Sequence, residues 1–166
     1  TCVACVMEGS RPILAEVQGL VCGTGFGTPR RMSTGFDYNR MSMLLAVLEK
    51  RAGYFFNNMD AYINVVGGLK LDEPAADLTV ALALVSSLKD KAVGEDVLAF
   101  GEVGLAGEIR AINNCEQRVS EAMRLGFKRC IIPFHNYKQL SKELKVNMDI
   151  VPVRTIRDAF NALVEE

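Results

Sequence analysis

One long apolar segment, Pro74 to Leu88, constrains the fold of this chain more than any other feature. Pro74 suits the first turn of a helix, where its missing N–H is not needed. Apolar side chains then recur at helical spacing and form a broad stripe, made of Leu78, Val80, Ala81, Leu82, Leu84, Val85 and Leu88. A helix that is apolar over most of its surface has to be enclosed by other elements. We therefore expect this segment to be the central core helix of a layered domain.

Strands and helices are predicted on both sides of this segment, and they do not alternate strictly. Residues 1–8 and 11–22 form two strands joined at Gly9-Ser10, a helix over 38–51 follows the N-cap Asp37, and 61–68 is a strand. Two strands are predicted after the core helix, within 96–112, and a capping box at Asn114 opens a helix over 114–124. The rest of the chain is predicted to form a strand over 129–133, a polar helix over 135–145, a strand over 148–153 and a closing helix. No repeat is visible, so the pattern predicts an α+β fold in a single domain spanning 1–166.

Composition is that of a globular domain and excludes few functions. The 166 residues are enough to bury a core, 49% of them are hydrophobic, and the net charge of −1 favours neither an acidic nor a basic partner. The charge is unevenly distributed, because residues 72–108 have a net charge of −6 and residues 110–157 a net charge of +6. Such polarity can orient one subunit against another or present a basic face to a polyanion, although solvated helix faces would produce it too.

The sequence indicates a chain without a membrane span and without a metal site. No apolar run reaches the roughly 18 residues that a membrane helix needs, and no secretory signal opens the chain. The scattered cysteines lack the second Cys/His pair that would complete a zinc site, and we expect reduced thiols in a cytoplasm: Cys2, Cys5, Cys22, Cys115 and Cys130. A strand-like start without an initiator Met is typical of a piece of a longer polypeptide.

Taken alone, the residues specify no reaction. There is no P-loop, and the glycine-rich stretch CGTGFGTP at 22–29 is followed by an extended segment instead of a helix, which favours a hairpin loop. The only histidine, His135, has no partner motif for nucleophilic catalysis and is interpreted as a surface or cap residue. Asp72 and Glu73 precede the core helix, and we expect them to stabilise its N-terminus.

Three motifs resemble, in order and spacing, the proteolytic domain of Lon-type ATP-dependent proteases: DEPAADLTVALALVSSL at 72–88, GEVGLAGEIR at 101–110 and KRCIIPFHN at 128–136. In that family the first motif carries a nucleophilic serine, and a later helix carries the lysine that activates it. The resemblance places Ala75 at the serine and Arg118 at the lysine. It also implies the mixed α+β fold of these domains, which is described as ribosomal protein S5 domain 2-like.

Both substitutions would disable such a dyad. Alanine has no nucleophilic atom, and arginine stays protonated at neutral pH and cannot act as a base. Asp77 adds a carboxyl where the family has a glycine. The resemblance therefore implies an inactive protease domain without catalytic residues. The alternative is a peptidase that uses Ser86 or Ser87, but both lie about three turns along the core helix and have no visible lysine partner.

Longer motifs resemble the C-terminal domain of the RadA (Sms) family of bacterial DNA repair and recombination proteins: EGSRPILAEVQGLV at 8–21, GFDYNRMSMLLAVLEKR at 35–51, NVVGG at 64–68, DEPAADL at 72–78 and FGEVGLAGEIR at 100–110. The resemblance covers nearly the whole chain and weakens at 22–29 and after Tyr137. It implies a longer protein with a zinc finger and a RecA-like ATPase upstream of Thr1, which would use Zn²⁺, ATP and Mg²⁺. This segment itself would bind no cofactor. The whole protein would drive branch migration of recombination intermediates in the bacterial cytoplasm, with the recombinase RecA as a partner.

A domain that contacts DNA without reading its sequence needs cations near phosphates. The candidates are Arg30 and Arg31 on the glycine-rich loop, Arg40 near a helix start, Arg110 and Arg118. Each could instead pair with a carboxylate, as Arg40 could with Asp37, or lie in a subunit interface. The resemblance implies a homo-oligomeric ring, a hexamer, in which modest contacts to double- or single-stranded DNA would add through avidity. A ring-forming module without DNA contact is the alternative.

Overall fold

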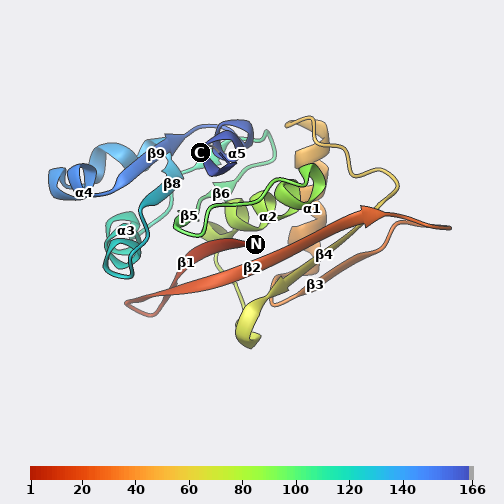
Figure 1. The fold of residues 1–166 in the computed structure, drawn as a ribbon, viewed down its shortest axis with the longest axis horizontal. Coiled ribbons are helices and arrows are strands. Elements are labelled where there is room, and N and C mark those ends of the chain that lie inside the picture. The colour runs from red at the N-terminus through yellow and green to blue at the C-terminus, as the bar shows by residue number, and fades with distance from the viewer. Residues whose placement is uncertain (165–166) are drawn as a thin grey trace.

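A mixed seven-stranded sheet runs through the molecule, which is described here by a computed structural model of residues 1–164 (Figure 1). Its strand order is β3-β4-β2-β1-β5-β8-β9. β2 pairs antiparallel with both β1 and β4, and the other neighbouring strands are parallel. A two-stranded antiparallel ribbon, β6-β7, stands apart from this sheet. With helices packed against the sheet, the fold is α+β and Lon proteolytic-domain-like, as predicted.

The strands of the large sheet are β1 (Cys2–Glu8), β2 (Arg11–Gly23), β3 (Arg31–Thr34), β4 (Met59–Val65), β5 (Val97–Ala99), β8 (Arg129–Pro133) and β9 (Asp149–Val153). The ribbon consists of β6 (Glu102–Val103) and β7 (Ile109–Arg110). The α-helices are α1 (Tyr38–Lys50), α2 (Asp77–Lys89), α3 (Cys115–Arg124), α4 (Lys142–Asn147) and α5 (Ile156–Val164). Short 3₁₀ helices are η1 (Val66–Gly68), η2 (Pro74–Ala76) and η3 (Phe134–Gln139).

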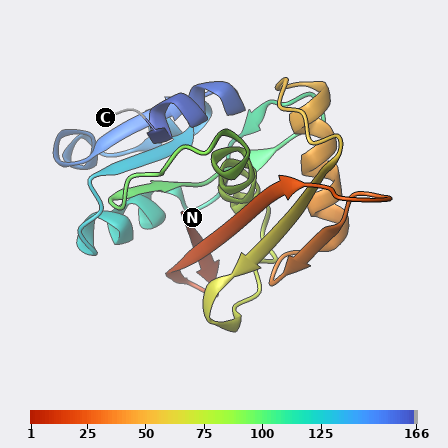
Figure 2. The same cartoon turned by 45° about the vertical axis from the view of Figure 1, so that its right-hand side comes forward.

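Helix α2 is the core helix that the apolar segment predicts. Figure 2 shows it nearly end-on, with α1 on one side and α5 above it. Every residue from Asp77 to Ser86 is buried. The helix lies so close to β2 that a Cβ on Gly19 would be 2.8 Å from the carbonyl oxygen of Ala83, so only glycine fits at that position. The turn that holds Ala75 is therefore attached to the most enclosed element of the fold.

The sheet separates two clusters of buried apolar side chains. Successive residues of a strand point to opposite faces, and accordingly Val97 and Ala99 of β5 belong to the cluster around α2, whereas Leu98 belongs to the other. The second cluster is covered by α3, through Cys115, Val119 and Ala122, and by Leu144 of α4. The helix that carries Arg118 thus packs on the face of the sheet opposite α2.

Predictions at two helix starts have different outcomes. Asp37 caps α1 as predicted, because its Oδ2 accepts a hydrogen bond from the Arg40 amide at 2.9 Å. The capping box at Asn114 is wrong. The backbone of Asn114 has a φ of 54°, in the left-handed region, and its side chain makes no capping bond to α3.

Three predicted boundaries are also corrected. The strand predicted over 61–68 ends at Val65 and continues as η1. The segment 96–112 contains three short strands instead of two. The helix predicted over 135–145 is divided into η3 and α4, because Leu140 is extended and Ser141 then starts a new helix by accepting from the Leu144 amide.

Candidate functional site

The turn at the start of α2, residues 73–77, holds the position at which the Lon resemblance places the nucleophile. Gly101 fixes this turn, since its amide donates to the Ala75 carbonyl at 2.8 Å and its carbonyl accepts from the Leu78 amide at 3.0 Å. Ala75 is 2% exposed and Ala76 is fully buried. The position therefore lacks a nucleophilic atom and is also closed to solvent.

Glu73, on one side of this turn, pairs with Arg118 of α3. The Glu73 Oε1 accepts from Arg118 Nη1, and its Oε2 accepts from Nη2 at 3.1 Å. Oε1 also accepts from the Met7 amide of β1 at 2.9 Å. Glu73 therefore does not serve the N-terminus of α2, as its position in the sequence suggested, but connects α2 to β1 and α3. Asp72, its neighbour, is exposed.

Arg118 is buried, with 1% of its side chain exposed, and all of its donors are occupied. A guanidinium has five N–H groups. Nε donates to the Asn113 carbonyl at 3.0 Å, Nη1 donates to the Cys5 carbonyl at 2.7 Å, and Nη2 donates to Asn113 Oδ1 at 2.8 Å. The two bonds to Glu73 complete the five. Arg118 is therefore a structural cation in the interior, and the structure removes it from the predicted phosphate contacts.

Asp77, on the other side of the turn, pairs with Arg40 of α1. Arg40 Nε donates to Asp77 Oδ1 at 2.5 Å, Nη2 donates to Oδ2, and the Val103 amide donates to Oδ2 at 3.2 Å. Asp77 is fully buried, and this burial raises the pKa of its carboxyl, while Arg40 and the Val103 amide act in the opposite direction. Arg40 is thus committed to Asp77, not to Asp37, and moving it to a phosphate would leave a buried carboxyl without its partner.

The turn is consequently held by an ion pair on each side. No hydroxyl, thiol or free amine among these five positions and their two arginine partners could attack a carbonyl or accept a proton. The alternative nucleophiles, Ser86 and Ser87, are both bonded to the main chain. Ser86 Oγ donates to the Lys91 carbonyl at 2.5 Å, and Ser87 Oγ accepts from the Val21 amide at 2.8 Å, so both hydroxyls bind the main chain.

Most of the thiols are buried, and the imidazole lies at the surface. Burial raises the pKa of Cys2, Cys5 and Cys115 to about 12 and that of Cys130 well above its ordinary value, whereas Cys22 is exposed. His135 is exposed and packs edge-on to the Phe134 ring. Within residues 1–164 no group of three His, Cys, Asp or Glu side chains could hold a metal ion.

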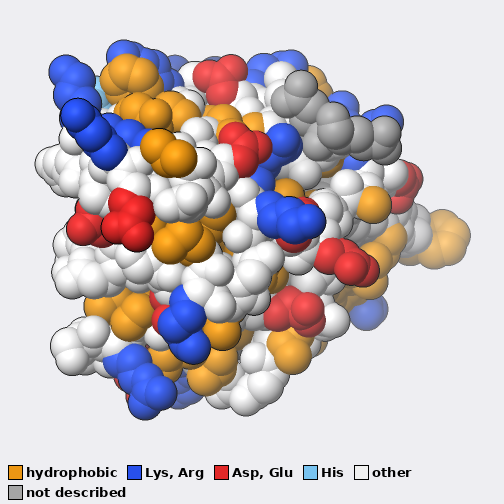
Figure 3. Space-filling view, turned by 60° about the vertical axis from the view of Figure 1, so that its left-hand side comes forward, with side chains coloured by type: hydrophobic (Ala, Val, Ile, Leu, Met, Phe, Trp, Pro, Cys, Tyr) orange, Lys and Arg blue, Asp and Glu red, His pale blue; other side chains and the backbone are white. Residues whose placement is uncertain are grey.

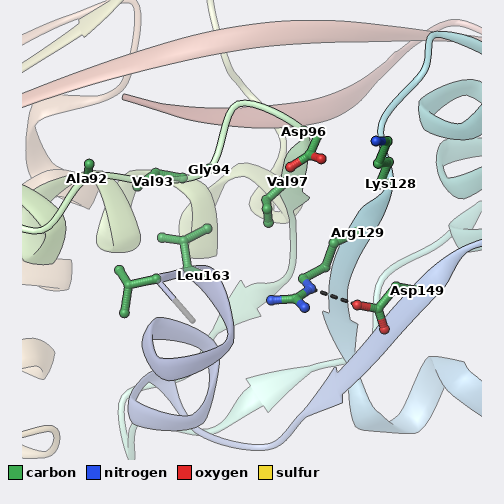
Figure 4. A pocket seen from close by; sticks show the side chains of 10 residues that line it. Ala92, Val93, Gly94, Asp96, Val97, Lys128, Arg129, Asp149 and Leu163 are labelled. Atoms are coloured by element: carbon green, nitrogen blue, oxygen red, sulfur yellow. Dashed lines mark hydrogen bonds and ion pairs between the residues drawn. The ribbon is translucent and has the colours of Figure 1, made fainter. Parts of the chain in front are cut away.

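A hollow of about 540 Å³ lies between the loop after α2, the start of β8 and the end of α5 (Figure 4). It is lined by residues 92–94, 96–97, 128–129, Asp149 and 163–164. Across it Arg129 Nε donates to Asp149 Oδ2 at 2.7 Å. Its lining contains no Ser, Thr, Cys or His, and its ionisable side chains are Asp96, Lys128, Arg129 and Asp149.

Three of the predicted DNA-contacting arginines lie at the surface. Arg30 is exposed, and its amide and the Thr24 hydroxyl both donate to Asp60 Oδ1 at 2.8 Å, which closes the base of the glycine-rich loop and lowers the pKa of Asp60. Arg31 is half-buried and donates to the carbonyls of Met59 and Phe56.

Arg110 is 56% exposed. It forms one ion pair with Glu108 at 3.2 Å and a second with Glu102 at 4.0 Å. Such exposed pairs contribute little to stability, so Arg110 can exchange its partner for a phosphate at small cost. Figure 3 shows a face of the molecule on which Lys and Arg side chains are interspersed with Asp and Glu, so the opposite net charges of the two segments do not give this face a single sign.

Sequence reasoning missed the partners of the two buried ions. Glu73 and Arg118 are 45 positions apart, and Arg40 and Asp77 are 37 apart, so no local spacing connects them. A signal was present in the two residues themselves: at positions where the Lon resemblance implies a glycine and a lysine, Asp77 and Arg118 carry groups that need an opposite charge when buried.

Comparison with known proteins follows the motifs. The chain matches the Lon protease (S16) C-terminal proteolytic domain over residues 38–166. It is 47% identical over 157 residues to the DNA repair protein RadA of Halalkalibacterium halodurans, 49% over 153 residues to that of Bacillus subtilis, and 48% over 156 residues to that of Streptococcus pneumoniae. These alignments cover 95%, 92% and 94% of this chain but 34%, 33% and 37% of the relatives. The chain spans about a third of the length of those relatives.

No helix within residues 1–164 has the length and apolar character to cross a membrane. The resemblance inferred from the motifs is confirmed by the match over residues 38–166 and by the identity to RadA proteins from several bacteria. The chain therefore belongs to the family of Lon protease C-terminal proteolytic domains, and within that family it is similar to the corresponding part of the bacterial RadA proteins.

Proposed function

We propose that this chain is a non-catalytic, Lon-like domain of a RadA-type DNA repair protein. In this proposal it provides the scaffold and a DNA contact for a motor that lies elsewhere in the same polypeptide. The DNA repair role is supported by relatives that carry the name DNA repair protein RadA and match over nearly the whole of this chain.

One observation carries the non-catalytic part of the proposal. Ala75 occupies the nucleophile position and is 2% exposed, while the guanidinium at the base position has its five N–H groups bonded to five acceptors. A residue that replaces a catalytic lysine and is fully bonded in the interior is a structural residue. The arginine that the resemblance places at the base position is thus the same residue that forms the ion pair with Glu73.

The first prediction concerns proteolysis. With casein or a fluorogenic peptide, the chain should cleave no faster than a buffer blank. The variant Ala75→Ser/Arg118→Lys should stay inactive, because the introduced hydroxyl lies in a buried turn and Glu73 retains the lysine as an ion-pair partner. The matched control is Ser86→Ala/Ser87→Ala. Cleavage that copurifies with the chain and disappears in this control would favour the peptidase alternative and overturn the proposal.

For the DNA contact the proposal relies on Arg30, Arg31 and Arg110, the three candidates at the surface. Arg30 forms no ion pair within the described residues, and its loop is closed at the base by Asp60. Cations that are held in place but not neutralised attract phosphates irrespective of base sequence.

The second prediction concerns duplex DNA. Replacing Arg30→Ala/Arg31→Ala should weaken binding of a labelled duplex and reduce the slope of log affinity against log salt by roughly two, since each lost phosphate contact removes about 0.9. Arg11→Ala/Arg124→Ala removes the same charge from exposed positions near the β1–β2 turn and should have a smaller effect. Light scattering on the same samples reports assembly. An assembled chain that binds no duplex at low salt would favour the oligomerisation-only alternative.

The wider context is also part of the proposal. We infer a homo-oligomeric ring, a hexamer by resemblance, and a longer polypeptide that binds ATP, Mg²⁺ and Zn²⁺ outside this segment. Branch migration in the bacterial cytoplasm, together with the recombinase RecA, would be the activity of that whole protein. The alignments to about a third of each relative are consistent with a longer polypeptide of this kind.

A further inference from the structure

A basic hollow lies where the C-terminal end of α1 meets the first turn of α5. It has a volume of about 560 Å³ and is lined by residues 49–53, Phe55 and Arg157. Lys50 and Arg51 close α1, and Arg157 is the second residue of α5. We call it the α1–α5 hollow. None of its residues belongs to the turn at Ala75 or to the arginines predicted from the sequence.

The ring of Tyr54 forms the base of the cation cluster beside this hollow. Arg157 Cζ is 5.4 Å and Lys89 Nζ is 5.7 Å from the ring centroid, distances at which a cation is attracted to an aromatic face. Tyr54 is itself buried and held edge-on by Phe160 of α5. Cations from two helices, Lys89 of α2 and Arg157 of α5, thus lie around one fixed ring.

These cations are not neutralised. Within residues 1–164 none of Lys50, Arg51, Lys89 and Arg157 takes part in an ion pair. Glu49 is the one carboxylate in the lining, and its Oε1 accepts from the Phe56 amide at 3.0 Å, which commits it to the main chain. The hollow is therefore positive and open to an anion.

The helix dipoles explain the positions of only some of the cations in and beside the hollow. Lys50 and Lys89 lie in the last turns of α1 and α2, where a cation is stabilised by the helix dipole. Arg157 lies in the first turn of α5, where the dipole opposes a cation. Gly53 makes room for it, because its φ is 78° and a Cβ there would lie 2.9 Å from Arg157 Nη2. The Arg157 guanidinium therefore lies close to the Gly53 backbone, at a helix end where the dipole does not favour a cation.

An exposed aromatic side chain completes the hollow. Phe55 lines it and is 65% exposed. A phenyl ring beside unpaired cations suits a ligand that combines phosphates with flat bases, because bases stack on aromatic faces while phosphates bind the cations. The hollow is also adjacent to the glycine-rich loop in the chain's own contacts, since Arg31 donates to the carbonyls of Phe56 and Met59, in the segment that follows Phe55.

We propose that the α1–α5 hollow binds single-stranded nucleic acid, with Arg51 and Arg157 on phosphates and Phe55 stacked against a base. This binding site adds detail to the proposed function. It rests on that function in one respect, namely that the chain binds nucleic acid. Duplex bases are stacked on one another and unavailable to Phe55, so the hollow distinguishes a separated strand from a duplex.

The test compares a labelled oligothymidine and a labelled duplex, each of about 20 nucleotides per strand, by fluorescence anisotropy across a salt series. Arg51→Ala/Arg157→Ala should weaken oligothymidine binding at least tenfold and reduce its salt slope by roughly 1.4, at about 0.7 per contact. Phe55→Ala should weaken oligothymidine binding by about tenfold, the contribution of one stacked base, and leave duplex binding unchanged. Arg51→Lys/Arg157→Lys should retain most of the affinity, and Arg11→Ala/Arg124→Ala is the charge-matched control.

The outcomes separate this site from the proposed duplex contact. Unchanged oligothymidine binding in both Arg51→Ala/Arg157→Ala and Phe55→Ala, with a wild-type chain that binds, would overturn the hollow and leave the Arg30–Arg31 contact intact. An equal loss in the Arg11→Ala/Arg124→Ala control would overturn it too, because net charge would then explain the result. Conversely, a loss confined to the hollow variants, with no effect of Arg30→Ala/Arg31→Ala on duplex, would support the hollow and reject the duplex contact. Melting temperatures near the wild-type value confirm that each variant folds.

Discussion

Arg118 illustrates at the residue scale how the position of a catalytic base can become part of the core. Lysine presents three donors from one point, whereas arginine presents five in a planar fork. The acceptors around Arg118 match that fork, because they are two carboxylate oxygens, two carbonyls and one amide oxygen on three different segments. Lysine could satisfy at most three of them.

The fourth prediction follows from this count. Arg118→Met should lower the free energy of unfolding by about 3–5 kcal/mol, because Glu73, 23% exposed, would lose its charged partner. Arg118→Lys should cost about 1–3 kcal/mol for acceptors left unpaired. Urea denaturation measures both. Arg124→Met, which removes an exposed partner of Glu121, is the control and should leave the midpoint nearly unchanged. A wild-type midpoint in Arg118→Met would show that the pair does not hold the turn.

At the scale of elements, the burial of the cysteine side chains shows how tightly the strands and α3 are packed. Cys5 of β1, Cys115 of α3 and Cys130 of β8 share the second core cluster, and Cys2 lies in the first. Cys22 lies near the end of β2 and is exposed. The thiols thus lie in both clusters of buried apolar side chains and, in the case of Cys22, on the exposed surface of the sheet.

The fifth prediction uses these thiols. At pH 8 a disulfide reagent should react quickly with one thiol of the five, and Cys22→Ser should abolish this phase, while unfolding should release the other four. The buried thiols keep their protons to a pKa of about 12 in the folded chain, against 9.0 when unfolded. The folded state then holds more protons, so the free energy of unfolding should fall as pH rises from 9 towards 12. Two or more rapidly reacting thiols in the native chain would contradict the packing of these elements.

The success of prediction also differs by element. The apolar stripe of α2 predicted its burial, and Asp37 predicted the start of α1, because both signals are local in the sequence. The Asn114 capping box failed although its spacing was suitable, because Asn113 and Asn114 are positioned by Arg118, whose Nε and Nη2 bind Asn113 while its amide binds the Asn114 carbonyl. The bonds that fix this helix start lie within five residues of one another, but they come from the Arg118 side chain and not from the Asn114 side chain that a capping box requires.

At the scale of the whole molecule, sequence motifs were sufficient for the family, but not for the surface. Arg40 and Arg118 were expected among the cations at the surface and proved to be bonded to carboxylates of the α2 turn. The α1–α5 hollow was not predicted, since its cations Lys50, Arg51 and Arg157 come from the ends of two helices, α1 and α5, that are distant in the sequence. Only the folded structure shows that these two helix ends meet.

The ion pairs beside Ala75 have a consequence for the evolution of this domain. A lineage that regained only the lysine would strand acceptors in the interior, and one that regained only the serine would place a hydroxyl in a sealed turn without a base. Under the proposed non-catalytic function, each single substitution would lower the stability of the chain or gain nothing, so a gradual change to a peptidase would not be favoured. Under that function, the pairing of Glu73 with Arg118 would therefore oppose a stepwise return to proteolysis in descendants of this chain.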